Sequence, residues 1–167
     1  MLRTSTARRK RKGVDPVSTT AGRQPILTPG RLLGAAKIGV VIHLVSTLTS
    51  LTASETAVSI GVGINLVLFL GGILVFVAAF LIAASRSRDE GVWFGGAFLL
   101  NGGVVDRGAR MTLFTCLGLQ IVVGVAGASL KPFTPAAFSV LTPLLGFALM
   151  ALYGSRYGRF PSRVAGG

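Results

Sequence analysis

The sequence predicts an all-α membrane protein with four transmembrane helices arranged as two antiparallel hairpins, both termini cytoplasmic, a disordered basic tail and an interfacial loop segment. Three observations lead to this class. The 167 residues are 51% apolar and 13% charged, with a mean hydropathy of +0.71, whereas soluble proteins average roughly 25% charged residues. Four apolar stretches are long enough to cross a bilayer. The 17 Lys and Arg residues fall mostly between those stretches.

The first 31 residues are rich in Arg, Lys, Ser, Thr, Pro and Gly and contain few bulky apolar side chains. Such a segment cannot bury enough surface to offset the entropy of ordering, so we expect 1–31 to be a disordered cytoplasmic tail. Anionic lipids attract a basic run of this kind, and its lack of interleaved aromatic residues argues against nucleic acid as a partner. The candidate lipid contacts are Arg8, Arg9, Lys10, Arg11 and Lys12.

The predicted transmembrane domain covers 32–155, with spans at about 32–52, 57–83, 111–130 and 134–155. About 20 helical residues cross the hydrocarbon core, and each span must be helical because lipid offers no partner to open backbone groups. The first span starts late and lacks a small-residue cleavage site, which favours a retained anchor over a cleaved signal peptide. The short connections after the first and third spans predict the two antiparallel hairpins.

The distribution of basic residues predicts the orientation. Fifteen Lys and Arg residues lie in the N-terminal tail, in the 85–110 connection and in the C-terminal segment 156–167, whereas the two short connections contain only Lys131. Because cytoplasmic loops carry the excess of Lys and Arg, we predict a multi-pass protein of the cytoplasmic membrane with both termini and the middle connection inside. Segment 156–167 is then a short basic cytoplasmic tail.

The middle connection contains a largely apolar stretch, 92–105, that is too short and too rich in Gly to cross the bilayer. We expect this stretch to lie in the membrane interface. The alternative is a re-entrant hairpin whose backbone is covered by protein or water. Amphipathic aromatic side chains favour the headgroup level, and the candidate interface anchors are Trp93, Tyr153 and Tyr157.

Each span has a polar or helix-breaking residue near its middle: His43, Asn65, Gln120 and the Thr142–Pro143 pair. Three hydroxyl residues share the helix face of His43, namely Ser46, Thr47 and Ser50. Because residues at similar depth can meet and His titrates near neutral pH, His43, Asn65 and Gln120 form a candidate site for a proton, a small solute or a quinone carbonyl. The alternative is that these side chains only hydrogen-bond across helices and fix the packing.

The composition excludes several kinds of site. One Cys, one His and five carboxylates cannot build an intrachain disulfide, a Cys-based metal site or a dinuclear metal centre. The Asp106–Arg110 segment matches only the start of a CDP-alcohol phosphotransferase signature, because the aspartates that should follow are absent, and we interpret it as a charged helix start. We therefore expect no catalytic, cofactor-binding or metal-binding residues and no enzymatic activity.

Two segments carry a resemblance to known sequences: 89–103, DEGVWFGGAFLLNGG, and 131–163, KPFTPAAFSVLTPLLGFALMALYGSRYGRFPSR. They resemble a small family of uncharacterised bacterial four-span membrane proteins that end in Gly-x-Arg-Tyr/His-Gly-x-Phe-Pro. The matching residues are Gly154, Arg156, Tyr157, Gly158, Phe160 and Pro161. The resemblance lies mainly in 89–167 and implies a four-span membrane fold without an established activity.

The function predicted from these features is that of a non-enzymatic accessory or assembly subunit of a larger membrane complex. The chain has almost no extramembrane domain and no catalytic constellation, but it has many small residues for helix contacts. The expected partners are anionic lipid and either a membrane protein or further copies of this chain. One alternative is a small homo-oligomeric transporter or channel built on the polar site, and another is a protein that handles quinone, heme or lipid.

Overall fold

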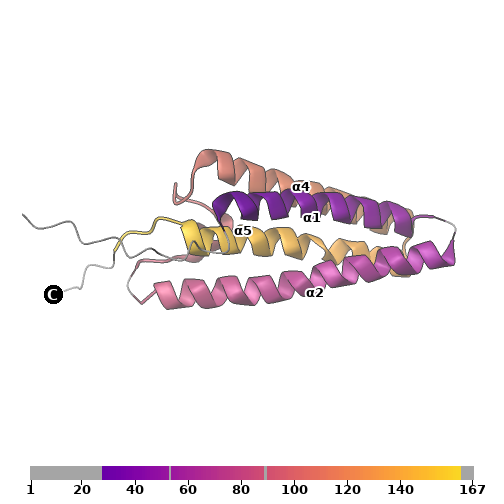
Figure 1. The fold of residues 1–167 in the computed structure, drawn as a ribbon, viewed down its shortest axis with the longest axis horizontal. Helices are drawn as coiled ribbons and strands as arrows, with labels where there is room; N and C mark the ends of the chain where they lie inside the picture. The colour runs from indigo at the N-terminus through magenta and orange to yellow at the C-terminus, as the bar shows by residue number, and fades with distance from the viewer. Residues whose placement is uncertain (1–27, 53, 89, 163–167) are drawn as a thin grey trace, which may run out of the picture.

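The computed structural model describes residues 28–52, 54–88 and 90–162, so the basic run at 8–12 and most of the predicted tail lie outside the described residues. Within this part, four helical segments are long and apolar enough to cross a membrane, which confirms the all-helical class and fits a multi-pass membrane protein. In chain order the elements are α1 (Pro29–Ser50), α2 (Glu55–Arg86), α3 (Phe94–Leu99), α4 (Arg107–Leu130), the 3-10 helix η1 (Pro135–Leu141) and α5 (Pro143–Tyr157) (Figure 1).

Two of the long helices start earlier than the predicted spans because polar side chains cap them. The Thr28 hydroxyl accepts a hydrogen bond from the backbone N–H of Arg31 at 3.4 Å, before the first turn of α1. The Asp106 carboxylate accepts from the N–H groups of Gly108 at 2.9 Å and Ala109 at 3.4 Å, before the first turn of α4. Such side-chain acceptors satisfy N–H groups that have no partner within the helix.

Consecutive long helices run in opposite directions (Figure 1). The start of α1, the connection between α2 and α4 and the end of α5 lie at one end of the bundle, and the short connections after α1 and α4 lie at the other. There, the Lys131 Nζ donates to the Thr52 carbonyl oxygen at 2.9 Å and so joins the two short connections. Helix α2 packs mainly against α5 and α1, whereas α4 packs mainly against η1 and α1.

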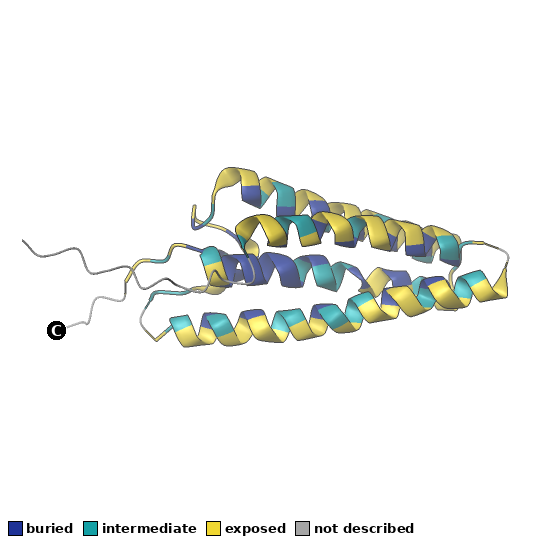
Figure 2. Cartoon of the chain, in the orientation of Figure 1, coloured by how far each residue is buried: buried dark blue, intermediate teal, exposed yellow. Residues whose placement is uncertain are grey.

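Helix α5 is the central element of the bundle. Figure 2 shows it as a mostly buried helix behind exposed outer helix faces, and 56% of the fourth span is buried within the chain, compared with 17% of α2. Glycines allow close approach to α5: Gly72 of α2 lies against the Leu145 backbone, and Gly146 and Gly154 of α5 lie against Gln120 and Ala97. The outer surface of the bundle is apolar, as at Leu74 of α2, which is 72% exposed; an apolar surface of this extent suits contact with lipid.

The fourth predicted span, 134–155, consists of two helical pieces, η1 and α5, which meet at the predicted helix-breaking pair Thr142–Pro143. Pro143 has no N–H and therefore cannot bond to the Ser139 carbonyl four residues earlier. The Thr142 N–H bonds to that carbonyl instead, at 3.2 Å, in the tighter 3-10 pattern. The resulting η1 backbone lies close to α4, where a Cβ at Gly124 would stand only 2.9 Å from the Ser139 carbonyl oxygen.

Helices α1 and α2 approach each other at Gly61, which has no side chain to hold them apart. A Cβ at Gly61 would lie 2.5 Å from the Ser46 carbonyl oxygen and 2.9 Å from the Ser50 backbone nitrogen. These are backbone atoms and cannot move without shifting α1. A Cβ at Gly63, two residues later on the same helix, would meet no atom within 4 Å.

We expect Gly61→Val to destabilise the protein by about 1–3 kcal/mol, because the new side chain overpacks the α1–α2 contact. Gly63→Val is the matched control and should change stability by less than about 0.5 kcal/mol. Unfolding in mixed detergent micelles measures both values. Equal losses for the two variants would contradict the observed packing of α1 on α2.

Candidate functional site

The structure buries the whole predicted polar face of α1. Its four members are His43, Ser46, Thr47 and Ser50. The His43 imidazole is fully enclosed by the chain and bonds to two other helices. Its Nδ1 lies 3.0 Å from the Asn65 side-chain oxygen on α2, and its Nε2 lies 3.2 Å from the Gln120 carbonyl oxygen on α4. The three residues predicted to meet are therefore in contact, although Gln120 takes part through its backbone.

Asn65 is the centre of this cluster. Its side-chain oxygen Oδ1 lies 2.8 Å from the Ser46 hydroxyl of α1 and 3.2 Å from the Thr142 hydroxyl at the start of α5, in addition to the His43 ring. All four spans thus contribute to one set of hydrogen bonds. We call His43, Ser46, Asn65, Gln120 and Thr142 the polar cluster.

The hydrogen-bonding capacity of the polar cluster is only partly used. Within the described residues, the Asn65 Nδ2 and both polar atoms of the Gln120 side-chain amide are buried without a partner. The Gln120 amide packs beside Gly39 and Gly146, where a Cβ at Gly146 would collide with the Gln120 Oε1. A buried unpartnered polar group costs about 1–3 kcal/mol, so these amides are the groups of the cluster with capacity to bind something more.

The geometry around His43 accommodates two protonation states. As positioned, both ring nitrogens face oxygen acceptors, which is the arrangement that an imidazolium with two N–H groups satisfies. Rotating the Asn65 side-chain amide by about 180° would place its Nδ2 group, in place of its oxygen, beside the His43 Nδ1. Nδ2 could then donate a hydrogen bond to the unprotonated Nδ1 of a neutral ring. These hydrogen bonds alone therefore do not fix the protonation state of His43.

The polar cluster lies next to one surface pocket but does not line it; that pocket is lined in part by Ile121, Leu141 and Pro143, the chain neighbours of Gln120 and Thr142. Four pockets on the described chain are lined entirely by residues outside the polar cluster. Among the described residues, no group of three His, Cys, Asp or Glu side chains lies close enough together to hold a metal ion.

A second cluster lies at the end of the bundle where α5 finishes, and Arg86 organises it. The Arg86 guanidinium donates to the carbonyl oxygens of Ser155 at 2.7 Å and Gly158 at 3.0 Å, and to the Glu90 carboxylate at 2.6 Å. It also lies 5.3 Å from the centre of the Phe160 ring. Arg86 therefore fixes the C-terminal end of α5 to the end of α2.

The middle connection and the segment after α5 form one unit with Arg86. The Gly91 N–H bonds to the Pro161 carbonyl and the Arg159 N–H to the Val104 carbonyl, both at 2.9 Å. Helix α3 packs against α5, where Gly154 leaves room for the Ala97 carbonyl. We call this unit, made of Arg86, 90–104 and 158–162, the end cap.

The predicted interfacial stretch 92–105 is mostly part of the end cap. Phe98 is buried and stacks with Phe94 of the same helix, with ring centres 4.7 Å apart, and it lies 5.6 Å from the Phe76 ring of α2. Phe94 itself is 63% exposed. The stretch therefore covers the end of the bundle. Phe98 faces the interior of the bundle, and Phe94 remains exposed on the outer surface.

The three predicted interface anchors occupy different environments. Trp93 is half-exposed on the end cap, and Tyr157 is partly buried, with its ring centre 5.3 Å from that of Tyr153. Tyr153 is only 7% exposed and therefore lies inside the bundle rather than at its surface. The physical reason is the central position of α5, which is enclosed around its circumference.

Sequence reasoning missed the structural role of Arg86, which it counted only as a cytoplasmic charge. The spacing of Arg86 and Glu90 was a local signal for their ion pair. The bonds to Ser155 and Gly158 join residues far apart in the chain and had no local signal.

Comparison of the chain with protein-family models, with curated proteins and with solved structures gives no match.

Removing the acceptor at the centre of the polar cluster should destabilise the bundle. We expect Asn65→Ala to lower the free energy of unfolding by about 1–3 kcal/mol, because several buried donors lose their partner. Thr142→Val removes one hydroxyl bond and should cost about 0.6 kcal/mol. Thr49→Val is the matched control, since its hydroxyl bonds only to the Val45 carbonyl of its own helix. Unfolding in detergent measures the three losses in free energy of unfolding. We expect the loss to be largest for Asn65→Ala, smaller for Thr142→Val and smallest for Thr49→Val, and any other order would contradict the central role of Asn65.

Removing the guanidinium of Arg86 should loosen the end cap. We expect Arg86→Gln to increase hydrogen exchange of the backbone amides in 91–104 by about tenfold or more, because two carbonyls at the end of α5 lose a charged donor. Arg88→Gln removes the same charge from an exposed neighbouring position and should leave the exchange unchanged. Similar exchange in both variants would show that Arg86 does not hold the cap.

Proposed function

We propose that this chain is a non-enzymatic accessory or assembly subunit of a larger membrane complex, located in the cytoplasmic membrane with both termini inside. The observation that carries the proposal is the end cap. The described residues between α2 and α4 and after α5 pack onto the end of the bundle and form a surface there.

The end cap has the composition of a protein-binding surface. Trp93, Phe94 and Leu99 expose apolar area there. Arg159 is exposed within the 158–162 segment of the cap, and Arg156 is exposed two residues before that segment. Aromatic residues and Arg are enriched in protein interfaces. Because Arg86 and the backbone hydrogen bonds hold the cap, a partner would not have to order it on binding, which reduces the entropic cost of association.

The arrangement of charges supports the proposed orientation. The start of α1, the middle connection and the end of α5 lie at one end of the bundle (Figure 1). The described Arg residues at or next to the span ends on this side are Arg31, Arg86, Arg88, Arg107, Arg110, Arg156 and Arg159. By the positive-inside rule, this end faces the cytoplasm.

A specific observation favours a second candidate, a small homo-oligomeric transporter or channel. The break between η1 and α5 lies beside the polar cluster, and buried amides of Asn65 and Gln120 have unused capacity. Broken helices next to polar groups are typical of binding sites in transporters. However, the cluster does not line the described surface pockets, which is why we favour the accessory subunit.

Purification in mild detergent from native membranes tests the proposal. We expect the tagged wild-type protein to retain a larger membrane protein in fixed stoichiometry, and Phe94→Ala to reduce that retention by about tenfold or more because an exposed aromatic contact is lost. Leu74→Ala, on the exposed outer face of α2, is the control and should retain the partner.

The same preparation distinguishes the two candidates. A homo-oligomer without another protein, together with proton or solute flux in proteoliposomes that His43→Ala abolishes, would contradict the accessory role and support the transporter. Absence of flux above empty vesicles, with the partner retained, would support the accessory subunit.

A further inference from the structure

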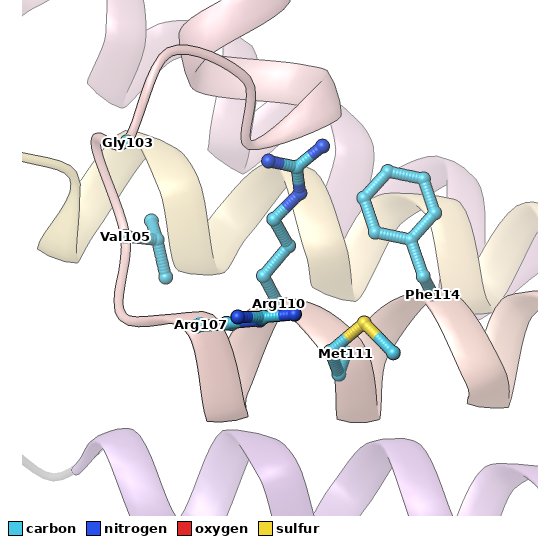
Figure 3. A pocket seen from close by; sticks show the side chains of 6 residues that line it. All are labelled: Gly103, Val105, Arg107, Arg110, Met111 and Phe114. Carbon is cyan, nitrogen blue, oxygen red and sulfur yellow. The ribbon is translucent and has the colours of Figure 1, made fainter.

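A cavity of about 470 Å³ lies where the connection from α3 meets the first turns of α4. Figure 3 shows the side chains that line it, four from α4 and the others from the preceding loop. The lining residues are Gly103, Val105, Arg107, Arg110, Met111 and Phe114. This volume is in the range of pockets that hold small molecules, about 300–1,000 Å³.

The charged part of this cavity is purely positive. Arg107 and Arg110 both line it, and none of its lining residues is acidic. The neighbouring Asp106 carboxylate accepts two backbone N–H groups of α4, and the Glu90 carboxylate pairs with Arg86. Within 28–52, 54–88 and 90–162, neither lining Arg forms an ion pair. The cavity therefore offers two guanidinium groups to an anion.

The rest of the cavity is apolar and follows the charged part along the helix. Arg107, Arg110, Met111 and Phe114 are spaced by one, three or four residues and share one side of α4. Met111 is 61% exposed, and the Arg110 guanidinium lies 5.6 Å from the Phe114 ring centre. From the start of α4 toward the middle of the bundle, the lining thus changes from cationic to apolar.

We infer that this cavity is a binding site for one anionic glycerophospholipid. The phosphate lies between the Arg107 and Arg110 guanidinium groups, which match phosphate oxygens by paired N–H donors. The first part of an acyl chain lies along Met111 and Phe114. The order of charge and apolar surface on α4 is the order in which a phospholipid presents phosphate and hydrocarbon at the interface.

This site differs from the predicted attraction of the 8–12 run to a charged membrane. That attraction depends on overall charge, whereas the cavity has a defined shape and an apolar wall. A free phosphate would use the guanidinium groups but leave the Met111 and Phe114 surface without a function. The inference does not depend on the proposed accessory role.

The single tryptophan of the chain makes the site measurable. The Trp93 ring packs against Gly102, where a Cβ would lie 2.6 Å from it, and the next residue, Gly103, lines the cavity. A lipid brominated near the ester end of its acyl chains should therefore quench Trp93 fluorescence when it occupies the cavity. The experiment uses the full chain in nonionic detergent micelles, titrated with brominated phosphatidylglycerol or brominated phosphatidylcholine.

We expect phosphatidylglycerol to reach half-maximal quenching at a mole fraction about tenfold lower than phosphatidylcholine. The double variant Arg107→Gln/Arg110→Gln should lose this preference. Arg88→Gln/Arg156→Gln removes the same charge from exposed positions outside the cavity and should keep it. Val105→Phe fills the cavity without changing charge and should also lose the preference, which covers the case in which the double Arg variant does not fold.

Three outcomes would overturn the inference. Equal quenching by the two lipids with the wild-type chain would exclude a selective site. Equal loss in both double Arg variants would attribute the selectivity to overall surface charge. Full competition by millimolar inorganic phosphate or glycerol phosphate would identify a phosphate site that does not need the acyl chain.

Discussion

The relative positions of the four spans depend on the hydrogen bonds around Asn65. Hydrocarbon surroundings offer no alternative partners to buried polar groups, so these groups must meet one another inside the bundle. Asn65 on α2 binds Ser46 and His43 of α1 and Thr142 at the start of α5, and His43 extends the contact to α4. Apolar packing alone would tolerate sliding of one helix along another, whereas this set of bonds selects one register.

The sequence contained enough information for the class of fold, for the approximate spans and for the meeting of the polar residues. Length and hydropathy determine which segments can cross a bilayer, and equal depth brings His43, Asn65 and Gln120 to one level. The break at Thr142 was visible as a Pro in the span, but the close approach of the η1 backbone to Gly124 of α4 had no signal in the local sequence. The burial of Tyr153 was not predictable from its own segment, because it depends on which helix becomes central.

The basic residues at the ends of the spans do more than direct topology. Each counts equally in the positive-inside rule, but the structure gives them different surroundings. Arg86 lies inside the end cap, where it donates to the carbonyls of Ser155 and Gly158. Arg107 and Arg110 instead line a surface pocket and form no ion pair with any residue that the structure describes. Composition could count these charges, but only the tertiary fold separates structural Arg residues from those available to a ligand.

The enclosure of α5 has a consequence for biosynthesis. Helix α5 is part of the last of the four spans in chain order, so it is synthesised after the other three. It nevertheless occupies the centre of the finished bundle. The contacts that α5 makes with α1, α2 and α4 can therefore form only after all four spans have been synthesised. Among the four spans, the last to be synthesised is thus the one with the largest share of protein contact and the smallest share of lipid-facing surface.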